Sequence, residues 1–172
     1  VECIFFSSSR VLKKQDPVTN LFRDAKNRSM PWTTVSNQQL DQMVNGNGVE
    51  RSQNHQGVVA VVGAFAFQPL EKVLRRDERG LLVILDSVTD PHNLGAILRS
   101  ALLLGADAVV IPKDRSAKIT GLVTKTSAGA SEHLPVVQVT NLVRTIESLR
   151  QEGYWSAAIA SGPKAQPLST ID

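Results

Sequence analysis

The second half of the chain alternates regularly between short apolar runs and helix-like segments, and this alternation limits the folds that it can adopt. Apolar runs that predict strands lie at Leu81–Asp86, Asp107–Ile111, Val136–Val139 and Tyr154–Ala160. Segments that predict helices lie between them, at Leu94–Leu104, about Ile119–Ala128 and Leu142–Glu152. Strands separated by helices of this length form a parallel sheet with right-handed crossovers. We therefore predict an α/β domain on a parallel sheet.

The first part of the chain predicts a smaller α/β domain. Its strand candidates are Glu2–Phe6, Thr33–Val35 and Val58–Val62, and its helix candidates are Pro17–Asn27 and Ser36–Val44. Proline suits the first turn of a helix, and Ser36 or Asn37 suits the cap of the second helix. We assign residues 1–67 to this domain, residues 68–80 to a linker that contains a short helix, and residues 81–172 to the parallel-sheet domain.

Composition is that of a globular protein in a reducing compartment. The 172 residues are 42% apolar and 20% charged, which is ordinary for a folded chain. No apolar stretch approaches the length that spans a bilayer, so we predict no membrane segment. Cys3 is the only cysteine, which excludes an internal disulfide and a cysteine-rich zinc site. These features together predict a cytoplasmic protein.

Charge is distributed unevenly along the chain. Residues 1–80 hold 11 lysines and arginines against 8 acidic residues, whereas residues 81–172 hold 8 of each kind. The excess includes two basic clusters, one at Arg10, Lys13 and Lys14 and the other at Lys72, Arg75, Arg76 and Arg79. A basic first half suits a partner that carries phosphate groups, although ordinary solvated surfaces explain the same charge equally well. Motifs must therefore decide between the two interpretations.

The segment from Asp86 to Ser100 is the most informative part of the sequence for function. It is a polar turn between a buried strand and a helix, which is where open α/β sheets bind their ligands. Asn93 suits the cap of the helix, and Arg99 lies in an otherwise apolar run. A buried guanidinium needs an acceptor, and a phosphate matches its planar fork. On spacing alone, two interpretations are equally favoured. In one, the two residues form a functional site; in the other, Asn93 only caps the helix and Arg99 is only a solvated residue.

A metal site in the same turn is disfavoured. Asp86, Asp90 and His92 offer ligand types that bind metals, but no further ligands follow at a recognised spacing. The Asp90-Pro91 pair is typical of a turn in which the carboxylate accepts nearby backbone N–H groups. We therefore predict no metal.

Several segments resemble one known family. The sequence DPHNLGAILRSA at Asp90–Ala101 closely resembles the first signature motif of the SpoU (TrmH-like) ribose 2′-O-methyltransferases of the knotted SPOUT superfamily. Further similarities are PKDRSA at residues 112–117, SAGASEHLP at residues 127–135, HQG at residues 55–57, and VTNLVRTIESLRQEGYW at residues 139–155. These segments are most similar to the bacterial branch that methylates guanosine in 23S ribosomal RNA.

The resemblance implies a fold, a reaction and partners. It implies a small RNA-recognition domain that resembles a ribosomal protein, followed by a catalytic α/β-knot domain, in a homodimer that uses S-adenosylmethionine on RNA. It implies a catalytic role for Arg99 and a site-building role for Asn93. Because arginine keeps its proton in proteins, we favour a role for Arg99 in holding a phosphate and stabilising an oxyanion.

Other residues are RNA-binding candidates by the same resemblance: His55, Gln56, His92, Lys113 and Arg115. Alternatives remain open for them. His55 also suits a loop histidine that bonds within its own domain, and the loop at residues 112–117 suits a local network of Lys113, Asp114 and Arg115. We interpret the small residues of segment 127–135 as close packing between a helix and the sheet.

The sequence also departs from the family. The glycine- and glutamate-bearing second motif and the serine- and asparagine-bearing third motif do not follow residue 160. Those motifs form the knot and most of the cofactor pocket, which leaves Ala160 and Ser161 as cofactor-binding candidates. We therefore expect a fragment that does not methylate RNA alone. One alternative is a non-catalytic RNA-binding module. An unrelated nucleotide-binding enzyme is disfavoured, because no dinucleotide or phosphate-loop motif follows Asp86.

Overall fold

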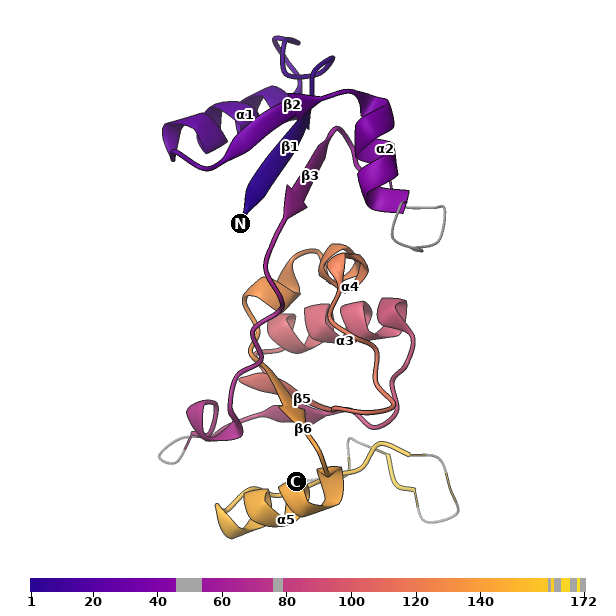
Figure 1. Ribbon diagram of the computed structural model, residues 1–172. Coiled ribbons are helices and arrows are strands. Elements are labelled where there is room, and N and C mark those ends of the chain that lie inside the picture. Colours follow the sequence, from indigo (N-terminus) through magenta and orange to yellow (C-terminus); the bar gives the residue numbers. More distant parts are fainter. Residues whose placement is uncertain (46–53, 76–78, 161, 163–164, 168–169, 171–172) are drawn as a thin grey trace. The chain divides into compact units, whose positions relative to one another are not determined.

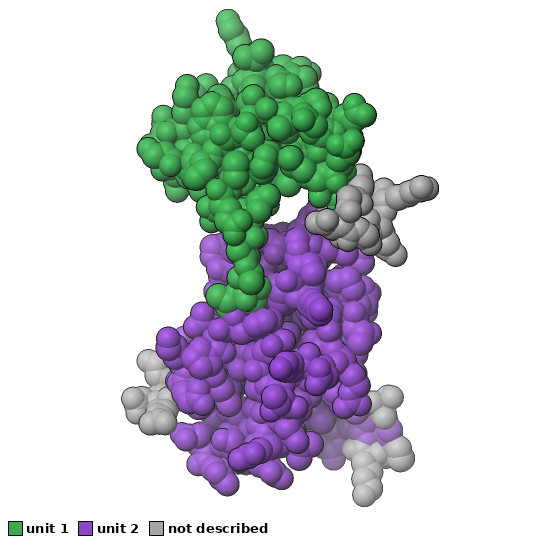
Figure 2. Space-filling view, viewed as in Figure 1, with its two compact units in different colours: residues 1–66 green, residues 67–172 purple. Residues whose placement is uncertain are grey.

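The chain folds into two compact α/β units, residues 1–66 and residues 67–172 (Figure 2). The structure is a computed structural model that describes residues 1–45, 54–75, 79–160, 162, 165–167 and 170. Each unit has its own sheet and its own buried core. No helix among these described residues is long and apolar enough to cross a membrane.

The first unit is a three-stranded sheet with the order β2-β1-β3 (Figure 1). Its elements in chain order are β1 (Cys3–Ser7), α1 (Pro17–Asn27), β2 (Trp32–Val35), α2 (Asn37–Asn45) and β3 (Val58–Val61). The central strand β1 pairs parallel with β2 and antiparallel with β3. The core is formed by Phe6, Val18 and Ala25, and the ring of Phe22 meets Phe6 edge-on with centroids 5.3 Å apart.

Both helices of this unit begin at a side-chain cap. The Asp16 carboxylate accepts the N–H of Val18 at 2.9 Å, and Pro17 occupies the first position of α1. At α2, the Ser36 hydroxyl accepts the N–H of Gln39 at 3.2 Å, while the Gln39 side chain accepts the N–H of Ser36 at 2.9 Å. This reciprocal pair is a capping box, so Ser36 is the cap of the two candidates that the sequence offered.

The second unit is a three-stranded parallel sheet with the order β4-β5-β6. Its strands are β4 (Leu82–Ile84), β5 (Ala108–Pro112) and β6 (Val136–Val139). Its helices are the short η1 (Leu70–Lys72), α3 (Pro91–Leu103), α4 (Gly121–Thr126), η2 (Ala130–Glu132) and α5 (Leu142–Gln151). Helices α3 and α4 lie on one side of the sheet and α5 lies on the other (Figure 1). The predicted α/β class with a parallel sheet is confirmed.

Residues 68–75 pack with the second unit, whereas the sequence suggested a linker there. The N–H of Gln68 donates to the carbonyl of Val136 at 2.9 Å. Val73 is buried in one core with Ala108, Val110 and Val137, and Leu70 packs against it. Apolar side chains in a charged segment explain the difference, because the sheet buries them while their charged neighbours stay in solvent.

Close packing joins α3 to the segment that contains α4 and η2. A Cβ added at Gly95 would lie 2.8 Å from the Cβ of Thr126 and 3.0 Å from the backbone nitrogen of Ser127. The small side chains of Ser127, Ala130 and Ser131 are buried. The segment is closely packed, but the prediction that it packs between a helix and the sheet is wrong, because its main neighbour is helix α3.

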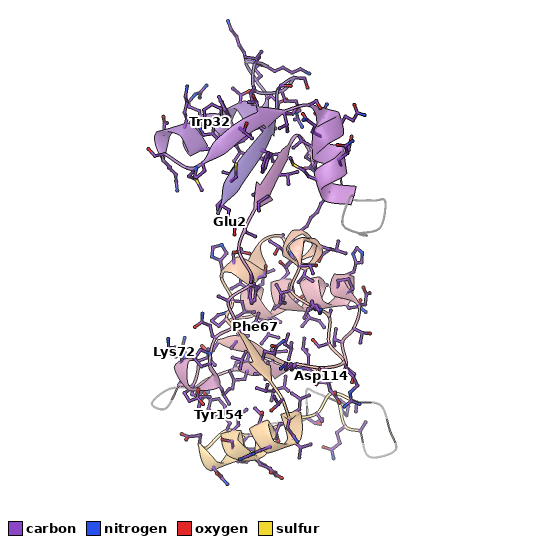
Figure 3. The ribbon with its side chains drawn as sticks, in the orientation of Figure 1. Glu2, Trp32, Phe67, Lys72, Asp114 and Tyr154 are labelled. Carbon is purple, nitrogen blue, oxygen red and sulfur yellow. The ribbon has the colours of Figure 1, made fainter. Side chains whose placement is uncertain are left out.

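The strand predicted at Tyr154–Ala160 is wrong, because the structure forms no strand in this described segment. Helix α5 ends at Gln151 and is followed by a left-handed Gly153. The hydroxyl of Tyr154, a residue labelled in Figure 3, accepts the N–H of Arg75 at 2.9 Å. Beyond Tyr154, Trp155 and Ile159 are 95% and 94% exposed. A strand needs a neighbour that pairs with its backbone, and an apolar pattern does not supply one.

Candidate functional site

The candidate site lies at the carboxyl ends of β4 and β5, beside the start of α3. Two loops meet there, one at residues 85–90 and the other at residues 113–117. The N–H of Ala117 donates to the carbonyl of Val88 at 2.8 Å and joins the two loops. The carboxyl edge of a parallel sheet is the usual place for ligand chemistry in this class of fold.

Helix α3 begins at Pro91, and Asp90 is its cap. The Asp90 carboxylate accepts the N–H of His92 at 2.9 Å, as expected for an Asp-Pro turn. The prediction that Asn93 caps this helix is therefore wrong. Proline lacks an N–H and has a preset φ, so the helix starts there and Asn93 becomes its third residue. The Asn93 side chain is exposed.

An open pocket of about 390 Å³ lies at this helix start. Its lining consists of Ser87, Val88, Thr89, Asp90, Asn93, Ala96 and Ile97. Ser87 has a left-handed backbone with φ of 56°, and its hydroxyl donates to the Asp86 carboxylate at 3.0 Å. Sequence reasoning missed Ser87, Thr89 and Ile97 as site residues. The sequence signal that could have identified the hydroxyls of Ser87 and Thr89 is the polar run directly after a buried strand.

Arg99 lies on a different side of α3 from the pocket. Six helical residues after Asn93 correspond to about 120° around the axis and about 9 Å along it. The buried side of the helix carries Leu94, Gly95, Leu98 and Ala101. Arg99 is exposed, so the argument from a buried charge does not hold, and its side chain has no hydrogen bond or ion pair within the described ranges. Its guanidinium faces solvent.

His92 lies on nearly the same side of α3 as Arg99, because seven helical residues correspond to almost two full turns. Both side chains are exposed. The structure thus brings Asn93 together with Asp90 and the hydroxyls of the turn, and it leaves Arg99 and His92 on an adjoining face. A ligand that extends around the start of α3 would meet both faces.

The loop after β5 presents two cations. Lys113, Asp114 and Arg115 are exposed there (Figure 3 labels Asp114), and Arg115 has a left-handed φ of 57°. The backbone N–H of Lys113 donates to the carbonyl of Val139 at 2.8 Å, which fixes the start of the loop. No ion pair joins these three side chains in the part of the chain that is described, so the alternative of a local network is not observed.

His55 and Gln56 lie in the first unit. The His55 ring accepts the N–H of Gly57 at its Nδ1 atom at 2.9 Å, and its Nε2 atom lies 3.3 Å from the Asp41 carboxylate. Its side chain is 12% exposed. The alternative of a loop histidine that bonds within its own domain is therefore observed. Gln56 is exposed, with a left-handed φ of 51°.

The two cofactor candidates lie at the end of the described chain. Ala160 is exposed and has no regular secondary structure. Ser161 lies outside the described residues. Within the described ranges, no group of three or more histidine, cysteine or acidic side chains could hold a metal ion.

Comparison with known families identifies the chain. The profile of the SpoU rRNA methylase family matches residues 80–172. A second profile, described as RNA 2′-O ribose methyltransferase substrate binding, matches residues 1–68. The chain belongs to the SpoU rRNA methylase family, and the resemblance seen in its motifs is confirmed.

Similar proteins in bacteria are assigned to the TrmH family of tRNA/rRNA methyltransferases. A protein of Staphylococcus haemolyticus is 39% identical over 150 residues, which cover 85% of this chain and 57% of that protein. A protein of Staphylococcus aureus strain COL is 40% identical over the same shares. The chain therefore spans a little more than half the length of these relatives.

Solved structures share the fold. The SpoU methyltransferase AviRb of Streptomyces viridochromogenes has a TM-score of 0.62 and 22% identity, covering 89% of this chain and 51% of that protein. An AdoMet-bound rRNA methyltransferase of Sinorhizobium meliloti has a TM-score of 0.60 and 19% identity, covering 88% and 51%. These likenesses confirm the fold of SpoU methyltransferases for this chain.

Proposed function

We propose that this chain belongs to an S-adenosylmethionine-dependent ribose 2′-O-methyltransferase that modifies a guanosine of ribosomal RNA in the cytoplasm and acts as a homodimer. The observation that carries the proposal is the pocket at the carboxyl edge of the sheet. It contains Asn93 of the family motif and lies in the region that matches the SpoU profile. RNA methylation as the family's activity supports the reaction class.

The lining of the pocket fits a ribose and the polar part of S-adenosylmethionine. It offers the hydroxyls of Ser87 and Thr89, the Asp90 carboxylate and the Asn93 amide, beside the apolar side chain of Ile97. When bound, the cofactor would supply the methyl group of its sulfonium to the ribose 2′-oxygen; the cofactor would leave as a neutral thioether, and the proton of the 2′-hydroxyl would pass to solvent. We propose Ala160 and Ser161 as further cofactor contacts, by resemblance to the family.

The roles of Asn93 and Arg99 follow from their exposure. The Asn93 amide in the pocket would orient the ribose through its hydroxyls. The Arg99 guanidinium, exposed and unpaired among the described residues, would hold a neighbouring RNA phosphate through two N–H groups. Fixing the phosphate fixes the ribose beside it, and the positive charge favours the oxyanion that develops at the 2′-oxygen. His92, Lys113 and Arg115 would bind phosphates further along the RNA.

Substitution in the intact enzyme tests these roles. We expect Arg99→Ala and Asn93→Ala each to lower the rate of methyl transfer to ribosomal RNA by about 10²-fold, measured with radiolabelled cofactor. Arg99→Lys keeps the charge and removes the planar fork, so we expect a loss of about tenfold or more. Arg144→Lys on α5 is the matched control, because Arg144 is also exposed on a helix. An unchanged rate in Arg99→Lys would exclude the phosphate fork.

A second candidate is that the chain on its own holds RNA without chemistry. The match of residues 1–68 to a substrate-binding profile favours RNA binding by the first unit. The open pocket and the exposed Ala160 favour the absence of chemistry in the isolated chain, because methyl transfer needs a cofactor held on several sides. We therefore propose that the isolated chain binds RNA and does not methylate it.

A further inference from the structure

The loop between β1 and α1, residues 8–16, is held in one conformation by many hydrogen bonds. The N–H groups of Arg10 and Val11 donate to the carbonyl of Ser7, at 3.0 and 3.2 Å. The N–H of Lys13 donates to the carbonyl of Arg10 at 3.1 Å. The Thr19 hydroxyl of α1 lies 2.8 Å from the carbonyl oxygen of Lys13. Hydrogen bonds to backbone groups therefore set the conformation of the loop, and its exposed side chains do not take part in them.

Arg10 lies at the centre of this loop and is fully engaged. Its Nε and Nη2 atoms donate to the two oxygens of Asp16 at 2.7 and 2.8 Å. Its Nη1 atom donates to the backbone carbonyl of Gln56, a residue 46 positions later in the chain. Arg10 belongs to a basic cluster in the sequence, but its charge is already paired. It joins the loop to the turn at residues 54–57.

The turn is shaped to receive Arg10. Gly57 is buried and has a left-handed φ of 87°, and a Cβ there would lie 2.7 Å from the Cδ atom of Arg10. His55 bonds inward to Gly57 and Asp41, so it does not face a partner. Gln56 is the member of this turn that is exposed next to the Arg10 contact. Glycine is required here so that the arginine side chain crosses the turn.

Four exposed residues lie on the loop and on the turn that Arg10 joins to it, and we call them the loop surface: Leu12, Lys13, Lys14 and Gln56. Leu12 is 85% exposed, and neither lysine forms an ion pair in the described part of the chain. Two unpaired ammonium groups on a fixed loop complement the phosphates of RNA. The Gln56 amide suits the edge of a base, and Leu12 suits the apolar face of one.

We propose that the loop surface is the RNA-docking surface of the first unit and that Arg10 is its positioning residue. This inference rests on the proposed function, because it takes RNA as the substrate. Lys13 and Lys14 bind phosphates, and Gln56 and Leu12 contact an unpaired base. Arg10 makes no contact with the RNA and holds the two segments in register through Asp16 and the Gln56 carbonyl.

Binding of fluorescein-labelled fragments of bacterial ribosomal RNA to the full chain tests the phosphate contacts. We expect the double variant Lys13→Gln/Lys14→Gln to bind about tenfold more weakly and to lower the slope of log K against log salt by about 1.4 to 1.8. The control Arg23→Gln/Arg28→Gln removes the same charge from exposed residues at α1 and its end. We expect it to change affinity less than twofold. Equal losses in both double variants would overturn the proposal, as would a wild-type chain that does not bind.

Asp16→Asn distinguishes a positioning role from simple electrostatics. This variant removes one negative charge and so raises the net charge of the chain by one. A surface that works by charge alone would therefore bind RNA more tightly. If Arg10 positions the loop surface, loss of its charged partner weakens binding by about threefold or more, with the salt slope unchanged. Asparagine also caps helices, so α1 is expected to remain folded. Tighter binding would overturn the role of Arg10.

A third measurement separates this proposal from the proposed function. In the intact enzyme, the Lys13→Gln/Lys14→Gln variant should raise KM for RNA by about tenfold and leave kcat unchanged, because the loop surface binds and does not react. Loss of kcat alone would overturn the docking role. Failure of the proposed function would instead appear as a wild-type intact enzyme that transfers no methyl group from S-adenosylmethionine to ribosomal RNA, while the binding of RNA to the loop surface could still be measured.

Discussion

The Arg10–Asp16 pair shows how a single contact organises several segments at the residue scale. Asp16 accepts two N–H groups from Arg10 and also caps α1 through the N–H of Val18. The hydrogen bond from Arg10 lowers the pKa of Asp16 below its usual value, and the backbone N–H of Val18 lowers it further. One carboxylate therefore joins the start of a helix to the loop surface, and its charged form is the form that the fold stabilises.

This pKa predicts a pH dependence of stability. A carboxyl whose pKa is lowered by folding adds stability above the pKa of the unfolded state, about 3.9, and loses it as the pH falls through the folded value. We expect wild type to have a higher Tm than Asp16→Asn at pH 7, with a gap that narrows as the pH falls below the unfolded value of about 3.9 and towards the lower folded value. Asp24→Asn, at an exposed position of the same helix, is the control. A gap that is independent of pH would contradict a role for the charge.

Local chemistry predicts some residues of the site, and tertiary packing decides the rest. The Asp90-Pro91 pair predicted a carboxylate that accepts nearby N–H groups, and Asp90 accepts the N–H of His92. The same pair excluded Asn93 as the cap, because proline at the first helical position moves the start of the helix forward. The exposure of Arg99 depends on which side of α3 meets α4 and η2, and a sequence pattern with leucines around the helix does not specify that side.

At the scale of elements, the carboxyl-terminal ends of helices were more predictable than strand pairing. Gly105 ends α3 in a left-handed conformation, and the N–H of Ala106 bonds back to the carbonyl of Ala101 at 2.9 Å. Gly153 ends α5 in the same way. These signals are local, so the sequence carries them directly. A strand at Tyr154–Ala160 would need another strand, distant in the sequence, to pair with its backbone. The apolar pattern of the segment does not specify that strand.

The contact between α3 and α4 predicts an unusual effect of alanine. In most helices Gly→Ala is stabilising by up to about 1 kcal/mol. At Gly95 the new Cβ would press on Thr126 and on the backbone of Ser127, so we expect Gly95→Ala to lower the free energy of unfolding by about 1–3 kcal/mol in urea. The pair Gly95→Ala/Thr126→Ala should recover part of the loss, because the Thr126 hydroxyl and methyl group are removed.

Gly121→Ala is the matched control for this prediction. Gly121 is the first residue of α4, and a Cβ there meets no atom within 4 Å. We expect a neutral or slightly stabilising effect. If Gly95→Ala were also neutral, the close approach of α3 to α4 would not constrain the helix that carries Asn93 and Arg99.

At the scale of the whole molecule, our proposals give RNA docking to the first unit, and the chemistry with its neighbouring phosphate contacts to the second. The first unit carries the loop surface and matches a substrate-binding profile, and the second carries the pocket and matches the SpoU profile. The chain covers 57% of similar proteins from staphylococci. The second unit has an open pocket, and the segment after Tyr154 exposes Trp155 and Ile159 to solvent. Exposed large apolar side chains of this kind are typical of a surface that another element or molecule covers.

Calorimetric titration of the chain with S-adenosylmethionine or its demethylated product tests this division. We expect no saturable heat, because the pocket is open to solvent and Ala160, the proposed further cofactor contact, is exposed. RNA binding by the same preparation is the control that the chain is folded. Micromolar cofactor binding would contradict the prediction and would require another segment or another chain to close the pocket.

If the segment after Tyr154 closed the pocket, the emission of Trp155, which is 95% exposed, would shift to shorter wavelength on binding. Trp155→Phe would abolish the shift. Binding without that shift would point to a second copy of the chain, and the apparent affinity would then rise with protein concentration.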